Sequence, residues 1–401
     1  MVPSVRKEYN QRFSQEKYNA FLQALNNVYP GQLDFRIAET PVFVPREFTQ
    51  QMLSACDAII DIINRPDYLV KSEKAIPAHL RVPKEDAHPH CIAFDFGVCW
   101  NSAGGLEPQL IEMQGFPSLF AWEVILPEVH REFFWTPPGY SDYLNGFDRH
   151  SYIELLKRII IAGEKTEEVI LLEIFPEKQK TRVDFHATAD LLGIATVSLT
   201  DLIQEGKNLF YKKEGRKIPV RRIYNRVIFD DLFQQPAEVQ EKGKIFQQEL
   251  NVTWVPHPNW FYRLSKFTLP FIHHPNVPET HFLHEMPLPA DLENYVVKPL
   301  FSFAGQGVII DVTKEDIAKI KDPANWIIQR KVDYAAAIET PDDPAKAEIR
   351  LFYFWEEGKT KPVAANNLAR LSKGKMIGVR YNKDKEWVGG SFCLFEGSQT
   401  I

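Results

Sequence analysis

A lysine followed by a glycine-containing loop is the first feature of this sequence that suggests chemistry. The stretch YVVKPLFSFAGQGV, residues 295–308, places Lys298 after two valines and directly before Pro299. Because β-branched residues favour an extended chain and proline cannot continue a ladder, we expect Lys298 at the end of a strand. Gly305 and Gly307 would let backbone N–H groups approach an anion closely, so the segment suits a polyphosphate. The alternative is a surface hairpin whose lysine reaches into water.

The order of these residues excludes two familiar phosphate motifs. In a P-loop the lysine follows the glycines, whereas here it precedes them. A dinucleotide fingerprint requires a helix to begin at the glycines, but GVIIDV, residues 307–312, predicts another strand. The local expectation is therefore a β-hairpin whose tip folds over phosphates.

Two carboxylates and an amide form a second candidate site. Residues 91–114 read as two strands around a glycine-containing turn, with Asp95 in the first strand and Glu112 and Gln114 in the second. Alternate residues of a strand share a face, so Glu112 and Gln114 project together, and Asp95 joins them if the strands pair. Mg²⁺ prefers such all-oxygen clusters. The alternative, which alternation also permits, is that these side chains lie on a solvated face.

A basic hairpin follows, with Glu214 and Gly215 as its turn. Its basic residues are Lys212, Lys213, Arg216, Lys217, Arg221, Arg222 and Arg226. A charge cluster at a hairpin tip is usually a solvated face. Arg222 and Arg226 differ, because they lie near the predicted carboxyl end of a strand, where open α/β sheets place ligands. For these two residues a substrate-binding role and a structural role both stay open; as substrate-binding residues they would permit an acidic substrate.

The elements that must position these residues alternate between helices and strands. Pro45 can begin a helix with one apolar face, which ends before Pro66. Ser151 and Glu154 predict a capping box for a second helix. The segment from 167 to 199 then reads as strand, helix and strand, which indicates a three-layer α/β domain. The fold class is therefore α/β, in the broader α+β sense.

Composition limits the classes of protein. The chain has 401 residues, 44% of them hydrophobic and 25% charged, which suits two or three globular domains. A net charge of −6 gives no general attraction to nucleic acid or anionic membranes, and no apolar run reaches the ~20 residues of a membrane span. The four cysteines are scattered, so we expect a reducing, cytoplasmic compartment. His88, His90, Cys91 and Cys99 match no closed tetrahedral zinc spacing.

Four sequence blocks, in order, resemble the circularly permuted ATP-grasp family, whose members include glutathionylspermidine synthetase-like proteins. CIAFDFGVCWNSAGGLEPQLIEMQGFPS is similar to the family's magnesium hairpin. GIATVSLTDL through PVRRIYNRVIFDD is similar to its pre-ATP-grasp layer, and YVVKPLFSFAGQGV to its first nucleotide-binding strand and glycine loop. WIIQRKVD, EIRLFYFW, NNLARLSKG and WVGG are similar to its hinge and closing strands. Together the blocks span roughly residues 90 to 390.

The resemblance implies a role for each residue that matches these blocks. Lys298 would contact the ATP phosphates under a lid of Gly305, Gln306 and Gly307; Gln329 and Lys331 would lie at the adenine; Asp95, Glu112 and Gln114 would hold magnesium; and Arg350, Asn367 and Arg370 would act at the phosphates or at an acyl-phosphate. From the residues alone, Arg350 needs either an anion or an ion pair near Glu348. Asn367 and Arg370, three apart, share a strand face only if the strand bulges or ends.

The resemblance also implies a domain order and an activity. Residues 1–130 would form the N-terminal part of the ATP-grasp core with the magnesium hairpin, 131–235 an inserted pre-ATP-grasp-like domain, and 236–401 the nucleotide-binding lobe and closing strands. The activity would be that of an ATP- and Mg²⁺-dependent carboxylate–amine ligase. Its partners would be small-molecule or peptide acids and amines, with no nucleic acid or membrane. The helix near the N-terminus would complete the core or form a homodimer face.

Two departures from the family pattern keep other functions open. Gln114 stands where the family has asparagine, and Ala93 stands where relatives often have an arginine. The longer amide of Gln114 can still bind a metal, one methylene further from the backbone. The alternatives are a catalytically inactive ATP-binding regulatory or scaffold protein, and an ATP-grasp phosphotransferase.

Overall fold

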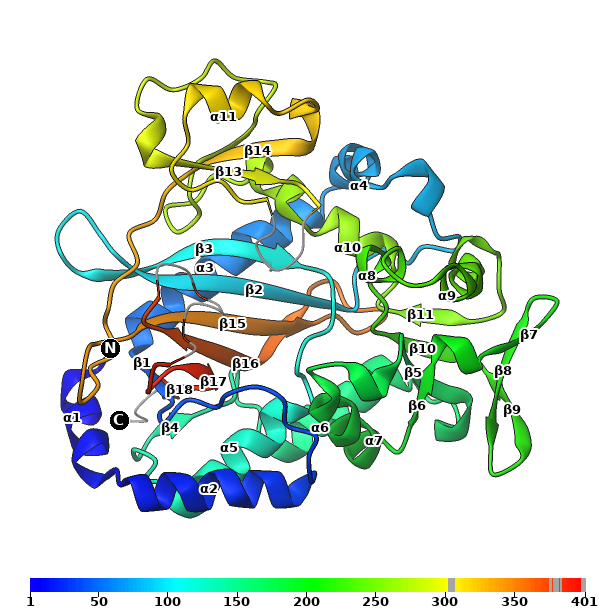
Figure 1. Ribbon diagram of the computed structural model, residues 1–401, viewed down its shortest axis with the longest axis horizontal. Helices are drawn as coiled ribbons and strands as arrows, with labels where there is room; N and C mark the ends of the chain where they lie inside the picture. Colours follow the sequence, from blue (N-terminus) through cyan, green and yellow to red (C-terminus); the bar gives the residue numbers. More distant parts are fainter. Residues whose placement is uncertain (302–306, 375–376, 378–381, 383, 398–401) are drawn as a thin grey trace.

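The computed structural model describes residues 1–301, 307–374, 377, 382 and 384–397. Within them the largest sheet has five strands in the order β17-β16-β15-β2-β3 (Figure 1). These strands are β2 (Cys91–Trp100), β3 (Leu106–Gln114), β15 (Lys346–Phe354), β16 (Val363–Ser372) and β17 (Gly389–Ser391). Every neighbouring pair in this sheet is antiparallel. The predicted hairpin at 91–114 is confirmed as β2 and β3.

Local turn chemistry closes this hairpin. The Asn101 side chain accepts hydrogen bonds from the backbone N–H groups of Ala103 and Gly105, at 3.0 and 2.8 Å. Gly104 has φ of +79°, which a residue with a Cβ rarely adopts. Asn101 and Gly104 therefore favour a tight turn, and this turn places β2 and β3 side by side.

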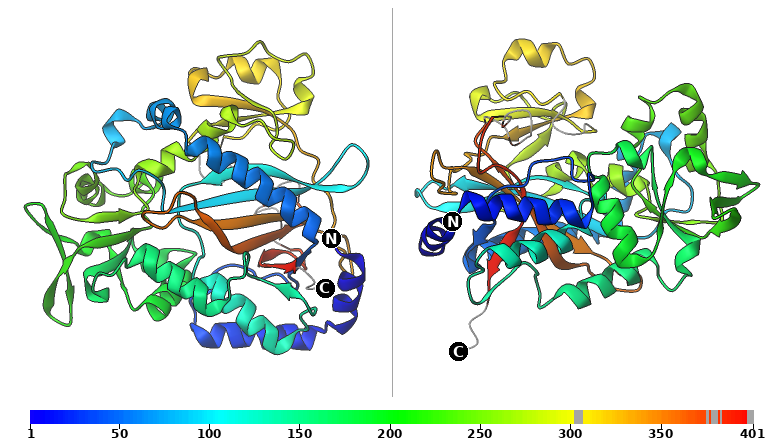
Figure 2. Two further views of the ribbon diagram at one scale, coloured as in Figure 1. Left: turned by 180° about the vertical axis from the view of Figure 1, so that it is seen from behind. Right: turned by 60° about the horizontal axis from the view of Figure 1, so that its bottom comes forward.

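The large sheet buries one face under α3 (Arg46–Ile63). Phe94, Phe96 and Val98 on β2 belong to the same apolar core as Met52 and Ile59 on α3. In Figure 2 this helix crosses the sheet diagonally in the view from behind. The predicted helix after Pro45 is confirmed, and its apolar face completes the core.

A second sheet is entirely parallel, in the order β11-β10-β5-β6. Its strands are β5 (Val169–Glu173), β6 (Ala195–Ser198), β10 (Arg222–Asn225) and β11 (Thr253–Val255). The helix α7 (Arg182–Leu192) connects β5 to β6, as the strand–helix–strand pattern predicts. This sheet includes β11 and thus continues beyond residue 235. The helix before it, α6 (Arg149–Ile160), begins earlier than predicted, because Asp148 is the cap and Ser151 the third residue of the capping box.

A small antiparallel sheet, β12-β14-β13, stands above the large one (Figure 1). It consists of β12 (Thr280–Phe282), β13 (Tyr295–Pro299) and β14 (Trp326–Arg330), and α11 (Lys314–Ala318) lies with it. Lys298 is on β13, at the predicted strand end. The strand predicted at 307–312 is reduced to one bridge, between Ile309 and Val297.

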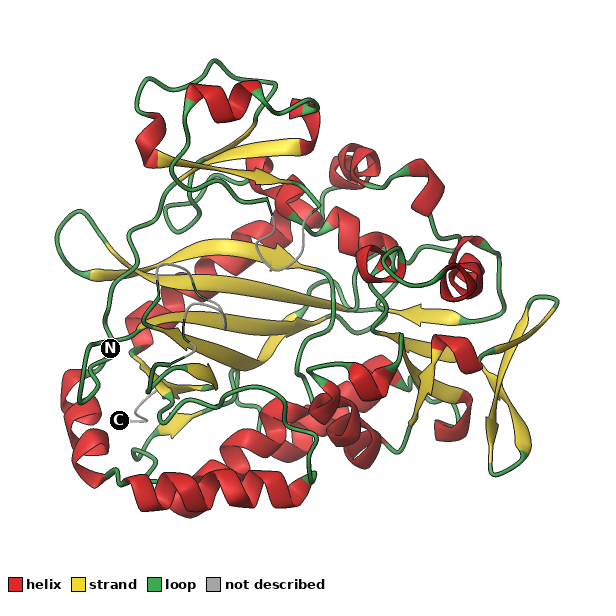
Figure 3. Cartoon of the chain, in the orientation of Figure 1, coloured by secondary structure: helices red, strands yellow, loops and turns green. Residues whose placement is uncertain are grey.

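The remaining elements frame these three sheets in a mixed α/β architecture (Figure 3). Two further sheets are β1-β18-β4 and β7-β8-β9. Their strands are β1 (Val42–Val44), β18 (Cys393–Glu396), β4 (Tyr140–Ser141), β7 (Ile203–Glu205), β8 (Asn208–Lys213) and β9 (Arg216–Val220). The other helices are α1 (Pro3–Arg12), α2 (Gln15–Val28), α4 (Pro66–Ser72), α5 (Trp122–Phe133), α8 (Phe229–Leu232), α9 (Ala237–Gly243) and α10 (Asn259–Arg263). Among the described residues, no helix is both long and apolar enough to cross a membrane.

Candidate functional site

The face of the large sheet opposite α3 carries a line of charged side chains. Asp95 on β2 lies directly opposite Glu112 on β3 and opposite Arg350 on β15. Glu348 lies on β15 as well, two residues before Arg350. It is directly opposite Arg370 on the next strand, β16. Because residues that are directly paired across strands project on the same face, the register itself gathers these five groups.

Asp95 is held by two arginines. Arg350 donates from Nε to Asp95 Oδ1 and from Nη2 to Oδ2, at 2.5 Å each. Arg370 donates from Nη2 to the same Oδ2 at 2.8 Å and to Glu348 Oε2 at 2.9 Å. Glu348 also accepts a hydrogen bond of 2.5 Å from the hydroxyl of Tyr334. These contacts form a continuous network across β2, β15 and β16.

Burial and the neighbouring arginines shift the pKa values of the two carboxylates in this network. Burial by itself would raise the pKa of Asp95, but the charges and hydrogen bonds of Arg350 and Arg370 outweigh it and hold the pKa below its usual value. Burial raises the pKa of Glu348, and Arg370 opposes that rise. Asp95 is therefore a fixed anion that positions two guanidinium groups.

Lys298 reaches the charged face from the small sheet. Its Nζ donates to Gln329 Oε1 on β14 at 2.6 Å and to the backbone carbonyl of Ile111 on β3 at 3.4 Å. Gln329 is fixed in turn by its own hydrogen bond of 2.9 Å to the Thr280 hydroxyl on β12. Burial lowers the pKa of Lys298 to about 8, which Glu112 partly opposes. A lysine from one sheet thus contacts a strand of another.

Lys266 is a site residue that the sequence analysis missed. It begins the short 3₁₀ helix Lys266–Phe271 and is only 8% exposed. Burial lowers its pKa, and the carboxylates of Glu112 and Asp230 raise it, while Lys266 itself lowers the pKa of Lys298. Two buried lysines therefore act on one region beside Glu112. The available signal was a lysine between apolar residues in the stretch RLSKFTLPF, which shows no helical or strand periodicity.

The predicted magnesium ligands are brought together only in part. Both carboxylate oxygens of Asp95 are taken by arginines, so its structural partners are guanidinium groups. Glu112 is 37% exposed, and Gln114 is partly exposed two residues further along β3. In the described ranges no three His, Cys, Asp or Glu residues gather as a metal site would require. Glu112 with Gln114 still suits Mg²⁺ that is held mainly by water and phosphate oxygens.

The two arginines predicted to bind substrate lie in different surroundings. Arg222 donates to the backbone carbonyls of Ile160 and Ile159, at 3.1 and 2.9 Å, where α6 ends. Arg226 donates to the carbonyls of Pro117 and Ser118 in the loop after β3. The Ser118 hydroxyl accepts from Arg350 Nη1 at 3.0 Å. Arg226 is thus connected to the charged face, whereas Arg222 binds a helix end.

Asn367 lies on the opposite face of β16 from Arg370. It pairs with Leu351, whose side chain belongs to the core under α3. Its amide donates to the Asp142 carbonyl at 2.7 Å, and its oxygen accepts from the Cys393 N–H at 2.6 Å. The register from 367 to 372 is regular, so the bulge that would have put both residues on one face does not occur there.

The remaining predicted nucleotide residues are placed as follows. Gly305 and Gln306 lie outside the described residues. Gly307 has φ of +73°, and a Cβ there would come within 3.0 Å of the Pro299 ring. Lys331 is at the surface, where its Nζ donates to the Glu293 carbonyl at 2.6 Å. Only Gln329 of the predicted adenine pair is next to Lys298.

Comparisons with known proteins show the fold. No protein-family model matches the chain, and no curated protein matches it. Among solved structures, a glutathione synthetase-like effector from Globodera pallida, in its apo form, superposes with a TM-score of 0.56 at 10% sequence identity. The alignment covers 97% of this chain and 97% of that chain. At such low identity the likeness concerns the fold alone, and it shows that this chain has the overall fold of that synthetase-like protein.

Proposed function

We propose that this protein is an ATP-dependent carboxylate–amine ligase of the circularly permuted ATP-grasp type. The observation that carries the proposal is the meeting of Lys298, from the small sheet, with the charged face of β2, β3, β15 and β16. Buried cations from two sheets, beside a partly exposed carboxylate, suit a bound polyphosphate. The fold likeness to a glutathione synthetase-like protein supports the same class of chemistry.

The proposed reaction has two steps. A substrate carboxylate oxygen attacks the γ-phosphorus of ATP. The bond between the γ-phosphorus and the β-phosphate oxygen breaks, ADP departs, and the acid becomes an acyl-phosphate. An amine nitrogen then attacks the acyl carbon, phosphate leaves, and the nitrogen loses a proton to give the amide. Lys298 and Lys266 would bind phosphate oxygens, and Arg350 and Arg370 would bind the acid or the transferring group. Glu112 and Gln114 would hold Mg²⁺, which supplies charge stabilisation when bound.

Asp95 would act by positioning in this site. Its carboxylate holds Arg350 and Arg370 in fixed orientations, so their charge is directed before any ligand arrives. A buried, pre-oriented guanidinium stabilises phosphate charge more than a solvated one, because it does not have to reorganise. Arg226 would support the site by fixing the loop at Ser118. We also propose a reducing, cytoplasmic location, since all four cysteines are free and buried.

A second candidate is a nucleotide-binding protein without ligase activity. The observation that favours it is the saturation of Asp95 by two arginines, together with an ion pair of 3.9 Å between Arg350 and Glu112, so that both carboxylates of the predicted magnesium set have a guanidinium partner. Such a protein would bind ATP through its lysines with little dependence on the metal. A phosphotransferase would differ from both, because it releases a phosphorylated product in place of an amide with free phosphate.

Calorimetric titration with a nonhydrolysable ATP analogue, with and without Mg²⁺, tests the nucleotide site. Lys298→Ala should weaken the affinity by at least about tenfold, which is the loss of one charge-assisted contact. Lys321→Ala, at an exposed lysine near α11, is the matched control and should bind like the wild type. Equal affinities in all three proteins would overturn the site assignment.

The ligase activity is tested by ADP release during a screen of acids with amines. Amide formation with equal amounts of ADP and phosphate supports the ligase. Analogue binding that is independent of Mg²⁺, combined with no ADP release for any pair, supports the non-catalytic protein. ADP release with a stable phosphorylated product supports the phosphotransferase.

A further inference from the structure

The segment between β14 and β15, residues 331–345, joins the small sheet to the large one, and we call it the strap (Figure 1). It meets the end of β2 through an antiparallel bridge between Tyr334 and Cys99. Next to this bridge, the backbone N–H of Ala335 donates a hydrogen bond of 2.9 Å to the carbonyl of Val98. The strap thus holds Tyr334 against the large sheet soon after the chain leaves the small one.

Gly97 leaves the space that the Tyr334 ring occupies. It lies on β2 directly opposite Glu348 on β15. A Cβ at Gly97 would come within 2.8 Å of Cε1 of the Tyr334 ring, which is closer than carbon atoms pack. Because the ring lies over this glycine, the Tyr334 hydroxyl can donate a hydrogen bond of 2.5 Å to Glu348 Oε1. Burial and the Glu348 carboxylate raise the pKa of Tyr334, so the hydroxyl stays protonated and remains a donor.

Glu348 connects Tyr334 to Arg370. Its Oε1 accepts from the tyrosine, and its Oε2 pairs with Arg370 Nη2 at 2.9 Å. The negative charge of Glu348 also raises the pKa of Lys298, against the effect of burial. This one carboxylate thus interacts with a residue of the strap, an arginine of β16 and the lysine of the small sheet.

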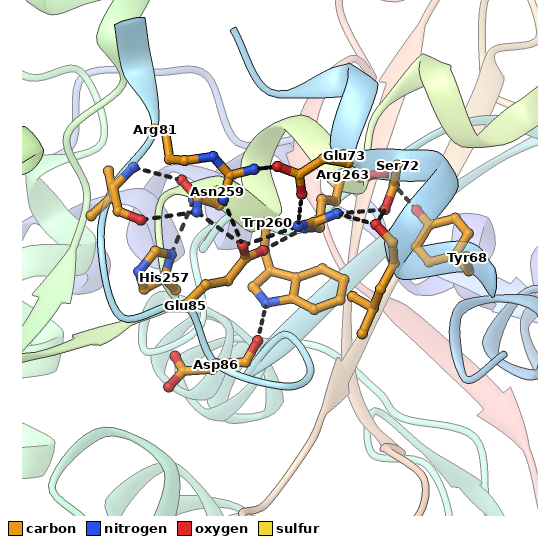
Figure 4. Close-up of polar contacts among 12 residues, drawn as sticks. Tyr68, Ser72, Glu73, Arg81, Glu85, Asp86, His257, Asn259, Trp260 and Arg263 are labelled. Carbon is orange, nitrogen blue, oxygen red and sulfur yellow. Dashed lines mark hydrogen bonds and ion pairs between the residues drawn. The ribbon is translucent and has the colours of Figure 1, made fainter. Parts of the chain in front are cut away.

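A second buried network, around Arg263, provides a contrast (Figure 4). Arg263 donates to both oxygens of Glu85, to Glu73 Oε2 at 2.8 Å, and to the Leu69 carbonyl and the Ser72 hydroxyl at 2.8 Å each. These five bonds use all five N–H groups of a guanidinium. With its side chain only 5% exposed, Arg263 links α4 to α10 and has no donor left for a ligand.

Arg370 is oriented without being saturated. Both of its ion pairs, with Asp95 and Glu348, are made by the single nitrogen Nη2. Its side chain remains 38% exposed. A buried ion network often adds little to stability, because desolvation of the charges offsets their attraction. The contacts of Arg370 are therefore better explained by the direction they give to its charge than by the stability they add.

We propose that Tyr334 is a positioning residue: its hydroxyl fixes Glu348, and Glu348 directs Arg370 toward the phosphoryl group that ATP transfers. This role rests on the proposed nucleotide site beside Lys298. A donor that is already oriented stabilises developing charge more than one that must first reorganise. Because the strap begins at the small sheet, the same hydroxyl also ties the direction of Arg370 to the sheet that carries Lys298.

The first measurement follows the Arg370 side chain by NMR in the full-length protein labelled with ¹⁵N-arginine. A guanidinium held by two carboxylates rotates slowly about its Cζ–Nε bond and gives separate Nη signals, which Arg370→Lys identifies by their loss. Tyr334→Phe keeps the ring over Gly97 and removes only the hydroxyl. The fold should therefore persist, while rotation becomes faster and the two signals move toward their average. Unchanged signals would overturn the positioning role.

Tyr18→Phe is the matched control. Tyr18 lies on α2, outside the charged face, and is 3% exposed. Its hydroxyl donates a hydrogen bond of 2.6 Å to the Ile37 carbonyl. This substitution also removes one hydrogen-bonded hydroxyl, but it should leave the Arg370 signals and the nucleotide affinities unchanged.

The second measurement compares nucleotide probes by calorimetry in the presence of Mg²⁺. The wild type should bind ADP with aluminium fluoride, a mimic of the transferring phosphoryl group, more tightly than ADP alone. Tyr334→Phe should weaken binding of this mimic by about tenfold or more, as is typical when a group that orients a ligand-binding residue is lost. It should leave binding of the nonhydrolysable ATP analogue nearly unchanged, whereas a merely structural hydroxyl would affect both probes alike or neither.

Two further substitutions test the route of this effect. The double variant Tyr334→Phe/Glu348→Gln should bind the mimic no more weakly than Glu348→Gln alone, because both changes act on one contact. Gly97→Ala keeps the hydroxyl but displaces the Tyr334 ring, so it should reproduce the effect of Tyr334→Phe. Additive losses in the double variant, or a Gly97→Ala protein that binds the mimic like the wild type, would overturn the proposal.

The nucleotide site and the role of Tyr334 fail in different ways. No binding of the ATP analogue by the wild type would overturn the nucleotide site and, with it, the role of Tyr334. Analogue binding by the wild type, combined with equal affinities of wild type and Tyr334→Phe for ADP with aluminium fluoride, would overturn only the role of Tyr334.

Discussion

Asp95 and Arg350 are 255 residues apart in the chain, yet they are paired on neighbouring strands by two hydrogen bonds of 2.5 Å. The pair is buried, with side-chain exposures of 1% for Asp95 and 11% for Arg350. A bidentate contact of this kind fixes the plane of the guanidinium as well as its charge. The orientation of Arg350, and with it the shape of the charged face, depends on this carboxylate.

Asp95→Asn should therefore destabilise the protein. Removing one partner of a buried ion pair leaves the other charge uncompensated, which typically costs about 3–5 kcal/mol of unfolding free energy. Urea denaturation measures the change. Asp61→Asn is the control, because Asp61 and Lys361 form an exposed pair, and its loss should leave the unfolding free energy nearly unchanged. If both substitutions change the unfolding free energy equally, the buried pair contributes no more to stability than the exposed pair.

The stabilisation by Asp95 should disappear in acid. The pKa of Asp95 is lower in the folded protein than in the unfolded chain, so its contribution is fully present above the unfolded pKa of about 3.9 and is lost as the pH falls through the folded value. The difference in unfolding free energy between wild type and Asp95→Asn should thus be constant near neutrality and shrink below about pH 4. A difference that grows in acid would contradict the direction of this shift.

Binding of the ATP analogue should weaken in alkaline solution. Burial lowers the pKa of Lys298 to about 8, so its ammonium form is dominant at pH 7 and becomes the minor form above pH 8. If only the ammonium binds phosphate, affinity without Mg²⁺ should fall about tenfold between pH 7 and pH 9. Calorimetry at several pH values measures this, and Lys298→Ala should lack the dependence.

Lys266→Ala should move that alkaline transition to higher pH. The positive charge of Lys266 lowers the pKa of Lys298. Removing that charge should therefore raise the pKa of Lys298, so that its ammonium form persists to higher pH. Overall affinity should fall while the midpoint of the pH dependence rises. An unchanged midpoint would mean that the two lysines do not interact, and the exposed Lys321→Ala serves as the control.

Arg222→Ala should lower stability without changing nucleotide affinity. Its guanidinium donates to two carbonyls at the end of α6, and leaving such buried acceptors unpaired costs about 1–3 kcal/mol. The neighbouring Arg221→Ala, at a half-exposed arginine with an ion pair at 3.6 Å, should cost about 1 kcal/mol or less. If Arg222→Ala instead keeps full stability and loses turnover, the residue binds substrate, as the sequence predicts.

Local patterns determined much of the framework. A glycine-containing turn between two apolar strands predicted the β2–β3 hairpin, and helical spacing of apolar residues predicted α3. The valines before Lys298 predicted the strand end at β13. Each of these signals acts between residues that are close in the chain, so a short stretch of sequence is enough to express it.

The tertiary structure alone decided which charged groups meet. Alternation along β16 shows that it has two faces, but only the packing against α3 and β18 assigns Asn367 to one and Arg370 to the other. Tertiary packing also places Lys266 near Lys298 and places the Arg222 guanidinium against the carbonyls at the end of α6. Asp95 met Arg350 because β2 pairs with a strand 255 positions further along the chain. Pairing at that separation is set by burial and register of the whole sheet, which no local pattern encodes.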